Sequence, residues 1–513
     1  MVKGKMTRRL FTQDELRELA TPYPDRIKSC IRENRLEEAV SLCKEMKESQ
    51  VTLHDFFAET CTVWWSWVGE NLGEERYEEM MRYLMEQDFH RQLLGLMPIL
   101  SIYQRFAGLL MALAWRSHSC FGAGEYPGKF TITEDDEKFS FHMQPCASGQ
   151  RCWIKGMYEP SRGGKLKEKA CWYTRNRKNF PYYCTHCSFV NEAIPYERFG
   201  YCLWPTDEPQ GPEDVCTWHF YKDPNQIPDK YYERLGLKKK QVPKIRPKRW
   251  MRRYLTEEEL RELTRPIPDR IIEKIQKKDL EGALGLCAEV KSEPLGLHQI
   301  YVNILVSVLT FISDKAREAT LGEVLDLQFE KCIKEQLFNR IKSMPPREKI
   351  LFLATKIFGT DTCNQTGVPK GKFAITETDK AIVFTLDPCG SGGCLLRGGA
   401  YDTMSRWKRW RENLEDSLTI ALCKLFPLSD SLLLWGFRVA GGNILGRKAY
   451  AQGKTKKEYP WSFGKKDVPY YCCQCGTLQN KLGDNFLKIH LPETKEHPCI
   501  WEIDKNYLEK GEA

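Results

Sequence analysis

The sequence predicts an α+β protein built from two tandem copies of one domain. Each copy is expected to be a helical subdomain followed by a small α+β subdomain with an antiparallel sheet. Early in each half, apolar residues recur at three- and four-residue spacing, which is typical of amphipathic helices. Later in each half, KFTITEDDEKFSFHMQPC and KFAITETDKAIVFTLDPC place two alternating runs around an Asp-containing turn, which predicts a β-hairpin. The third observation is that motifs recur in the same order in both halves.

The first of these motifs opens each half. RRLFTQDELRELATPYPDR begins at Arg8 and RRYLTEEELRELTRPIPDR at Arg252, 244 residues later, and each contains a Thr-x-x-Glu capping box. Five further pairs follow in order: TLHD with GLHQ, GKFTITE with GKFAITE, PCASG with PCGSG, PYYC with PYYC, and VCTWHF with PCIWEI. Six ordered matches predict a tandem duplication.

The matches set the expected domain boundaries. Repeat one is expected at 1–236, with a helical part at 8–115 and a cysteine-rich α+β part at 125–235. Repeat two is expected at 251–513, with a helical part at 252–358 and a cysteine-rich α+β part at 370–508.

Two segments fall outside this common plan. Residues 237–250 are basic and contain prolines, which predicts a solvated linker. The spacing between equivalent cysteines grows from 243 residues at Cys146 and Cys389 to 288 at Cys184 and Cys472. Repeat two therefore carries an insertion of about 45 residues near 401–453.

Composition narrows the class of protein. With 42% hydrophobic and 29% charged residues, the 513-residue chain is expected to be soluble and globular. The 78 basic residues nearly match the 69 acidic ones, so the net charge of +9 does not indicate a nucleic-acid partner. The start MVKGKMTRRLFT lacks a secretory h-region, and polar residues and a proline interrupt the apolar stretch Leu93 to Trp115. A cytoplasmic location follows, in which the 21 cysteines are thiols or metal ligands.

Four cysteines occupy equivalent places in the two repeats and are the candidate metal ligands. They are Cys146, Cys184, Cys187 and Cys216 in repeat one, and Cys389, Cys472, Cys475 and Cys499 in repeat two. Each Cys-x-x-Cys turn directs two sulfurs to one place, and two further cysteines complete a tetrahedral set for Zn²⁺. An iron–sulfur cluster also takes four thiolates, and four reduced buried thiols are the structural alternative.

The Pro-Cys-x-Ser-Gly loop suggests a second chemistry. Repeat two reads CGSGG from Cys389, whereas repeat one reads CASGQ from Cys146. Backbone N–H groups near a thiolate stabilise negative charge, so Cys389 is a candidate nucleophile as well as a candidate ligand. A hairpin exit that only needs glycine is the structural alternative. If the loop is catalytic, repeat two is the expected active site.

The chain has only nine histidines, and two of them recur at matching helical positions, His54 and His298. Glu330 lies on a later helix of repeat two. A His and a Glu from neighbouring helices form a candidate acid–base pair, so His298 and Glu330 join Cys389 as candidate catalytic residues. A histidine hydrogen-bonded within a helical core is the structural alternative.

The end of repeat one places Cys-x-Trp-x-Phe in a strand after a short acidic lead-in, Asp214 to Phe220. This pattern resembles the last strand of small-molecule-binding domains of the 4-vinyl-reductase type. The resemblance covers about ten residues per repeat. It implies a helical layer against a sheet that encloses a ligand, with cysteines available for metal. The motifs PYYCxxC and PCxSG are not part of this resemblance.

Together these features predict a metal-binding protein, with zinc as the expected metal and a pocket for a small-molecule ligand or substrate. Its enzymatic version is a metal- or cysteine-dependent hydrolase or lyase. Two alternatives stay open: a non-catalytic ligand or metal sensor with structural zinc, and an iron–sulfur redox or accessory protein. No nucleic-acid partner and no membrane are expected.

Overall fold

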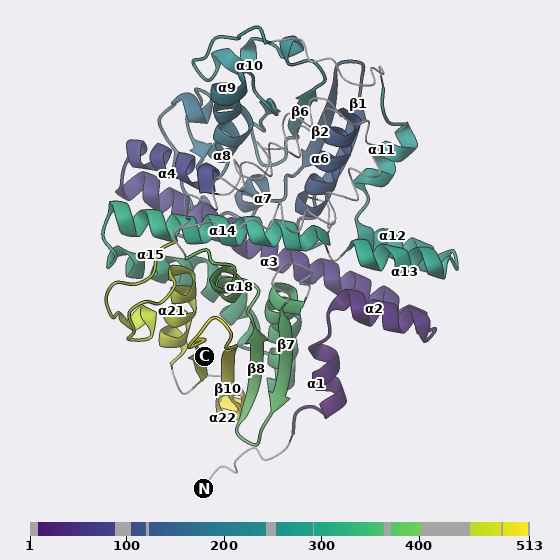
Figure 1. The fold of residues 1–513 in the computed structure, drawn as a ribbon, viewed down its shortest axis with the longest axis vertical. Helices are drawn as coiled ribbons and strands as arrows, with labels where there is room; N and C mark the ends of the chain where they lie inside the picture. Colours follow the sequence, from purple (N-terminus) through teal and green to yellow (C-terminus); the bar gives the residue numbers. More distant parts are fainter. Residues whose placement is uncertain are drawn as a thin grey trace. The chain divides into compact units, whose positions relative to one another are not determined.

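The structure is a computed structural model that confirms the α+β class (Figure 1). The residues it describes are 9–87, 104–119, 123–242, 253–290, 292–363, 371–401, 452–483 and 486–510. Within them the chain forms many helices, two four-stranded antiparallel sheets and one two-stranded sheet.

The described residues divide into two compact units. Unit 1 contains those within Met1–Thr60, Ile267–Asp402 and Lys448–Ala513, and unit 2 contains those within Cys61–Pro266. This division differs from the sequence repeats. The start of repeat one belongs to the unit that holds the sheet of repeat two, and the start of repeat two belongs to the unit that holds the sheet of repeat one.

The two four-stranded sheets have the same strand order. In unit 2 the order is β1-β2-β6-β5, and in unit 1 it is β7-β8-β10-β9. The bounds in unit 2 are β1 Lys129–Glu134, β2 Lys138–Gln144, β5 Thr206–Asp207 and β6 Cys216–Tyr221. Those in unit 1 are β7 Lys372–Glu377, β8 Ala381–Asp387, β9 Leu487–His490 and β10 Cys499–Asp504. A duplication would produce such a correspondence, and the duplication itself stays an interpretation of the sequence.

Alternation of side chains gives each hairpin one core face. On β2, Phe139, Phe141 and Met143 are fully buried on one side of the strand. The buried side of β8 is formed in the same way by Ile382, Phe384 and Leu386. The expected hairpins are confirmed, since β1 pairs antiparallel with β2 and β7 with β8.

Unit 1 is largely helical around its sheet. Its longer helices are α1 Gln13–Leu19, α2 Tyr23–Arg32, the first part of α3 Leu36–Asn71, α12 Ile267–Gln276, α13 Leu280–Glu289, α14 Ser292–Lys315, α15 Thr320–Gln328, α17 Pro346–Phe352 and α21 Cys473–Leu482. Two π-helical segments, η5 Phe329–Phe338 and η6 Leu353–Cys363, continue α15 and α17. The shorter helices are α16 Asn339–Ile341, α18 Gly392–Arg397, η7 Pro460–Ser462, η8 Tyr470–Cys472 and α22 Lys505–Lys510.

Unit 2 holds the rest of α3 and its own helices. They are α4 Glu74–Gln87, α6 Gln104–Ser119, α7 Gly149–Ile154, η2 Trp172–Thr174, α8 Thr185–Cys187, η3 Ser188–Ala193, α9 Ile194–Phe199, η4 Pro224–Gln226, α10 Lys230–Glu233 and α11 Glu257–Thr264. The two-stranded sheet pairs β3 Leu166–Lys167 with β4 Phe180–Pro181.

The N-terminal segment of repeat one, just before α1, is attached to the sheet of repeat two. The predicted capping box of α1 is present, with Thr12 and Glu15 bonded to each other's backbone, and α1 lies beside β7 (Figure 1). The buried carboxylate of Glu377, at the end of β7, accepts the backbone N–H groups of Leu10 at 2.7 Å and Phe11 at 3.0 Å. Lys505 completes this contact with an ion pair of 2.7 Å.

Unit 2 contains the equivalent contact. Glu134, at the end of β1, accepts the N–H groups of Tyr254 at 2.7 Å and Leu255 at 2.9 Å, just before α11. Lys222 pairs with the same carboxylate at 2.8 Å. The second predicted capping box, Thr256 with Glu259, is also present.

Several expectations concern segments at the limits of the described residues. The predicted insertion at 401–453 and residues 243–250 of the predicted linker lie almost wholly outside them. The first part of that linker is exposed but anchored, because Val242 and Asn225 exchange two hydrogen bonds. The described end of the apolar stretch Leu93 to Trp115 is a largely buried helix, as predicted.

One described segment, Leu297–Lys315 within α14, has the length and apolar composition of a membrane span. However, 78% of its most apolar window is buried inside the structure, which is typical of a core helix in a soluble protein.

Candidate functional site

The sheet of repeat two brings two of the four cysteines together. Cys389 follows β8 directly after Pro388, and Cys499 is the first residue of β10. The antiparallel register places Cys499 opposite Leu386, three residues before Cys389. The order and register of the strands, which the sequence did not specify, therefore make these two cysteines neighbours.

The other two cysteines come from the start of α21. Cys472 and Cys475 are three residues apart at this helix terminus, so they lie on one face of its first turn. The preceding Tyr470 fixes the turn to α14 and the loop after it, through hydrogen bonds with Ser313 at 2.7 Å and Glu318 at 2.8 Å.

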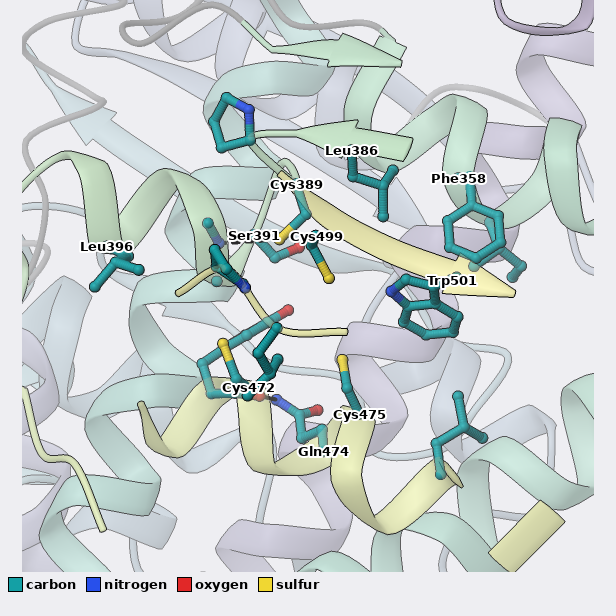
Figure 2. A pocket seen from close by; sticks show the side chains of 18 of the residues that line it. Phe358, Leu386, Cys389, Ser391, Leu396, Cys472, Gln474, Cys475, Cys499 and Trp501 are labelled. Atoms are coloured by element: carbon teal, nitrogen blue, oxygen red, sulfur yellow. Dashed lines mark hydrogen bonds between the residues drawn. The ribbon is translucent and has the colours of Figure 1, made fainter. Parts of the chain in front are cut away.

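The loop after Cys389 approaches Cys472 very closely. A Cβ atom added to Gly392 would lie 2.8 Å from the Cys472 sulfur, so only glycine leaves room for this sulfur. The backbone N–H of Gly393 donates to the Cys389 sulfur at 2.9 Å. Figure 2 shows the sulfurs of all four cysteines directed toward the same space.

That space is a cavity of about 190 Å³ in unit 1. All four cysteines line it, and most of the remaining wall is apolar, including Phe358, Leu386, Leu396 and Trp501 (Figure 2). The amide of Gln474 is one of its few polar groups, and it accepts a hydrogen bond of 2.7 Å from Gln328.

Repeat one gathers its own four cysteines in unit 2 by the same connections. Cys216 begins β6 opposite Met143, three residues before Cys146. A Cβ on Gly149 would lie 2.5 Å from the Cys184 sulfur, as at Gly392 in repeat two. The thiols of Cys146, Cys184 and Cys187 are all close enough to Cys216 to interact with it electrostatically.

Burial keeps several of these thiols protonated at neutral pH when no ion is bound. It raises the pKa of Cys472 well above the usual value, and it raises that of Cys499 to about 12 although a hydrogen bond from Trp501 opposes the shift. In repeat one the buried Arg175 lies near Cys187 and acts in the opposite direction, lowering the pKa of this thiol against the larger effect of burial.

The side chains do not form a finished coordination sphere. In the part of the chain that the structure describes, no group of three or more His, Cys, Asp or Glu side chains is arranged to hold a metal ion. The four sulfurs of repeat two face one space, but they are not in the arrangement of metal ligands.

The candidate catalytic residues are only partly brought together. His298 is buried on α14, and its Nε2 lies 3.4 Å from the hydroxyl of Ser391 in the loop after Cys389. Its ring also packs edge-on against Phe57. Glu330 lies apart from the cavity lining, where it is 42% exposed and paired with Lys334.

His54 behaves as a core histidine. Its Nε2 lies 3.2 Å from the hydroxyl of Tyr301, and the two rings pack edge to face. This contact mirrors that of His298 with Phe57, because Tyr301 and Phe57 occupy equivalent positions in the two repeats.

A polar chain on the sheet of unit 2 was not anticipated. Ser140 lies 2.8 Å from Nδ1 of His219, whose Nε2 lies 2.9 Å from Asp207. Asp207 also accepts a hydrogen bond of 2.9 Å from Tyr231. Ser140 is buried on a strand paired on both edges, so neighbouring backbone N–H groups are committed to the sheet and do not form an oxyanion hole.

Comparison with protein-family models, with curated proteins and with solved structures found no match for this chain. The site is therefore interpreted from its own geometry, and the resemblance to domains of the 4-vinyl-reductase type stays a prediction.

Proposed function

We propose that this chain is a zinc-binding protein with one four-cysteine centre in each repeat, and that the centre of repeat two forms part of the wall of a small-molecule pocket. The observation that carries the proposal is the convergence of Cys389, Cys472, Cys475 and Cys499 from separate segments on one cavity. Zn²⁺ prefers such a set of sulfur ligands.

Two local features fit bound thiolates. The N–H of Gly393 already donates to the Cys389 sulfur, and hydrogen bonds of this kind stabilise sulfur in its anionic form. Gly392 lets Cys472 approach the loop that carries Cys389. Zinc would replace the protons of the thiols.

A centre with four thiolates has no open position, so its zinc would stabilise the fold. An open position would instead make a hydrolase or lyase possible. In that enzyme Cys389 or the zinc would meet the substrate, and His298 would act through Ser391. The contact of 3.4 Å between His298 and Ser391 is what supports this second candidate.

The same residues also support a location in a reducing compartment. The eight cysteines of the two sets are free thiols. We therefore extend the proposal to a cytoplasmic location, where such thiols persist and bind metal.

Metal analysis of anaerobically purified protein tests the proposal. We expect about two zinc ions per chain, one for each four-cysteine set. Cys472→Ser should remove the ion of repeat two, whereas Cys171→Ser, at a half-buried cysteine outside both sets, should leave the zinc content unchanged.

Other results would redirect or end the proposal. Iron with labile sulfide would identify an iron–sulfur protein. Folded protein that neither contains zinc nor takes it up would overturn the metal-binding function. Zinc that survives Cys389→Ser would indicate that Cys389 is not a ligand and strengthen its case as a nucleophile.

A further inference from the structure

The cavity of unit 1 has the size of a single small molecule. Its volume is about 190 Å³, somewhat larger than an engineered cavity of about 150 Å³ in another protein that binds benzene. Such a space admits one aromatic ring with a short substituent.

The wall of this cavity differs from the equivalent positions of repeat one. Gly393 and Leu396 line the cavity, and the equivalent residues of repeat one are Gln150 and Trp153. Gln150 is fully buried, and its side chain donates to the carbonyl of Asp214 at 2.6 Å. Repeat one therefore places an amide and an indole where repeat two has a glycine and a leucine.

The electrostatic surroundings also differ. In repeat one, Arg175 is 1% exposed and pairs with the buried Glu192 at 3.2 Å, close to Cys187. The equivalent of Arg175 in repeat two is Phe463, which packs against the hydrophobic cluster around Cys475. The thiols of repeat two thus face a more apolar environment.

The basic residues in the cavity wall do not provide a free buried cation. Arg397 already donates to the carboxylate of Asp387 and to the carbonyl groups of Lys495 and Glu496. Lys495 and His497 are exposed. A charged ligand would therefore lose its hydration in an apolar space without a new buried partner, which is costly.

We propose that this cavity binds a compact, uncharged, apolar molecule of about the size of one aromatic ring, in contact with the four cysteines of repeat two. This inference gives the ligand class of the small-molecule pocket in the proposed function, and it rests on that pocket. It does not require the zinc ion.

Calorimetric titration with toluene and with benzoate tests the ligand class. The two probes share a ring and differ in charge. We expect saturable binding of toluene at one site per chain, and binding of benzoate weaker by about tenfold or more. Benzoate that binds as tightly as toluene, or the absence of saturable toluene binding, would overturn the proposal.

The variant Leu396→Trp locates the site, because it introduces the residue that repeat one carries. The added ring fills the cavity, so the dissociation constant for toluene should rise by about tenfold or more. Thr131→Trp adds the same ring at an exposed position of β1 and should leave the constant unchanged. Equal affinities in Leu396→Trp and the unmodified chain would refute binding in this cavity.

Circular dichroism checks that Leu396→Trp is folded, and the smaller Leu396→Phe serves if it is not. Zinc is measured on the same samples. Zinc-loaded protein that does not bind toluene would refute the ligand proposal and leave the metal proposal standing. Toluene binding by folded protein that never takes up zinc would support the ligand proposal and refute the metal proposal.

Discussion

Replacing Glu377 by glutamine tests the contact that fixes the N-terminal segment to unit 1. The Glu377 side chain is 0% exposed and holds Lys505, which is 1% exposed, together with the N–H groups of Leu10 and Phe11. Glutamine keeps one acceptor oxygen but removes the charge, so Lys505 loses its carboxylate. Removing one partner of a buried ion pair costs about 3–5 kcal/mol. We expect the free energy of unfolding of unit 1 to fall by this amount.

Urea unfolding of full-length protein measures the effect, and limited trypsin digestion reports on the segment itself. Cleavage after the exposed Arg9 and Arg17 should become faster when the segment is released. Glu330→Gln is the matched control, because its ion pair with Lys334 is half-exposed. Exposed pairs of this kind contribute about 0.5 kcal/mol or less.

The double variant Glu377→Gln with Lys505→Met makes the test sharper. Removing both charges leaves no unpaired buried ion, so the double variant should be more stable than Glu377→Gln alone. The reasoning would be refuted if Glu377→Gln cost less than about 1 kcal/mol, or if the two substitutions simply added.

Three further substitutions probe other parts of the two units. Gly392→Ala should destabilise unit 1 by about 1–3 kcal/mol and lower zinc retention, because the new Cβ would lie 2.8 Å from the Cys472 sulfur. Gly285→Ala is its control: this position on α13 has open space around it, so urea unfolding should show a gain of about 0.5–1 kcal/mol. The third substitution is at Asp207. Burial raises the pKa of its carboxyl group, but hydrogen bonds from His219 and Tyr231 outweigh the effect of burial and hold this pKa below its usual value of 3.8. The ionised carboxylate therefore stabilises unit 2 above about pH 4, and this contribution is lost as the pH falls through the folded pKa. Asp207→Asn should flatten the change in urea midpoint between about pH 6 and about pH 3.

Each of these predictions has a result that would contradict it. Unchanged stability and zinc content in Gly392→Ala would show that the loop can move away from Cys472. A stability loss in Gly285→Ala would mean that α13 tolerates no Cβ there. An Asp207→Asn variant with the same acid-induced loss as the unmodified protein would remove Asp207 from the groups that link stability to pH.

Local sequence patterns predicted local structure well. The capping boxes at Thr12 and Thr256 are present, and the alternating runs form the expected hairpins. These features depend on neighbours within a few residues, so they can be read directly from the chain.

Contacts between distant segments were harder to predict. Glu134 and Glu377 end matching strands, and Lys222 and Lys505 follow matching strands, so each ion pair had a visible signal in the repeats. The backbone N–H groups that these carboxylates also bind gave no signal in the sequence, because nearly every residue type carries a main-chain N–H. Similarly, the sequence predicted Glu330 and His298 on neighbouring helices. The direction of the Glu330 side chain depends on how the helices pack, and helical periodicity does not predict this packing.

The contact at Glu377 also constrains the order of events during synthesis. Residues 9–20 leave the ribosome early, but Glu377 and Lys505, which hold them, are made much later. Unit 2 has all its described residues once Pro266 has emerged. At about 10 residues per second, the first helix then waits roughly 20–30 s for Lys505. During that interval its apolar face is exposed to chaperones and proteases, so a ribosome that stalls in repeat two would leave a chain with an unprotected N-terminus.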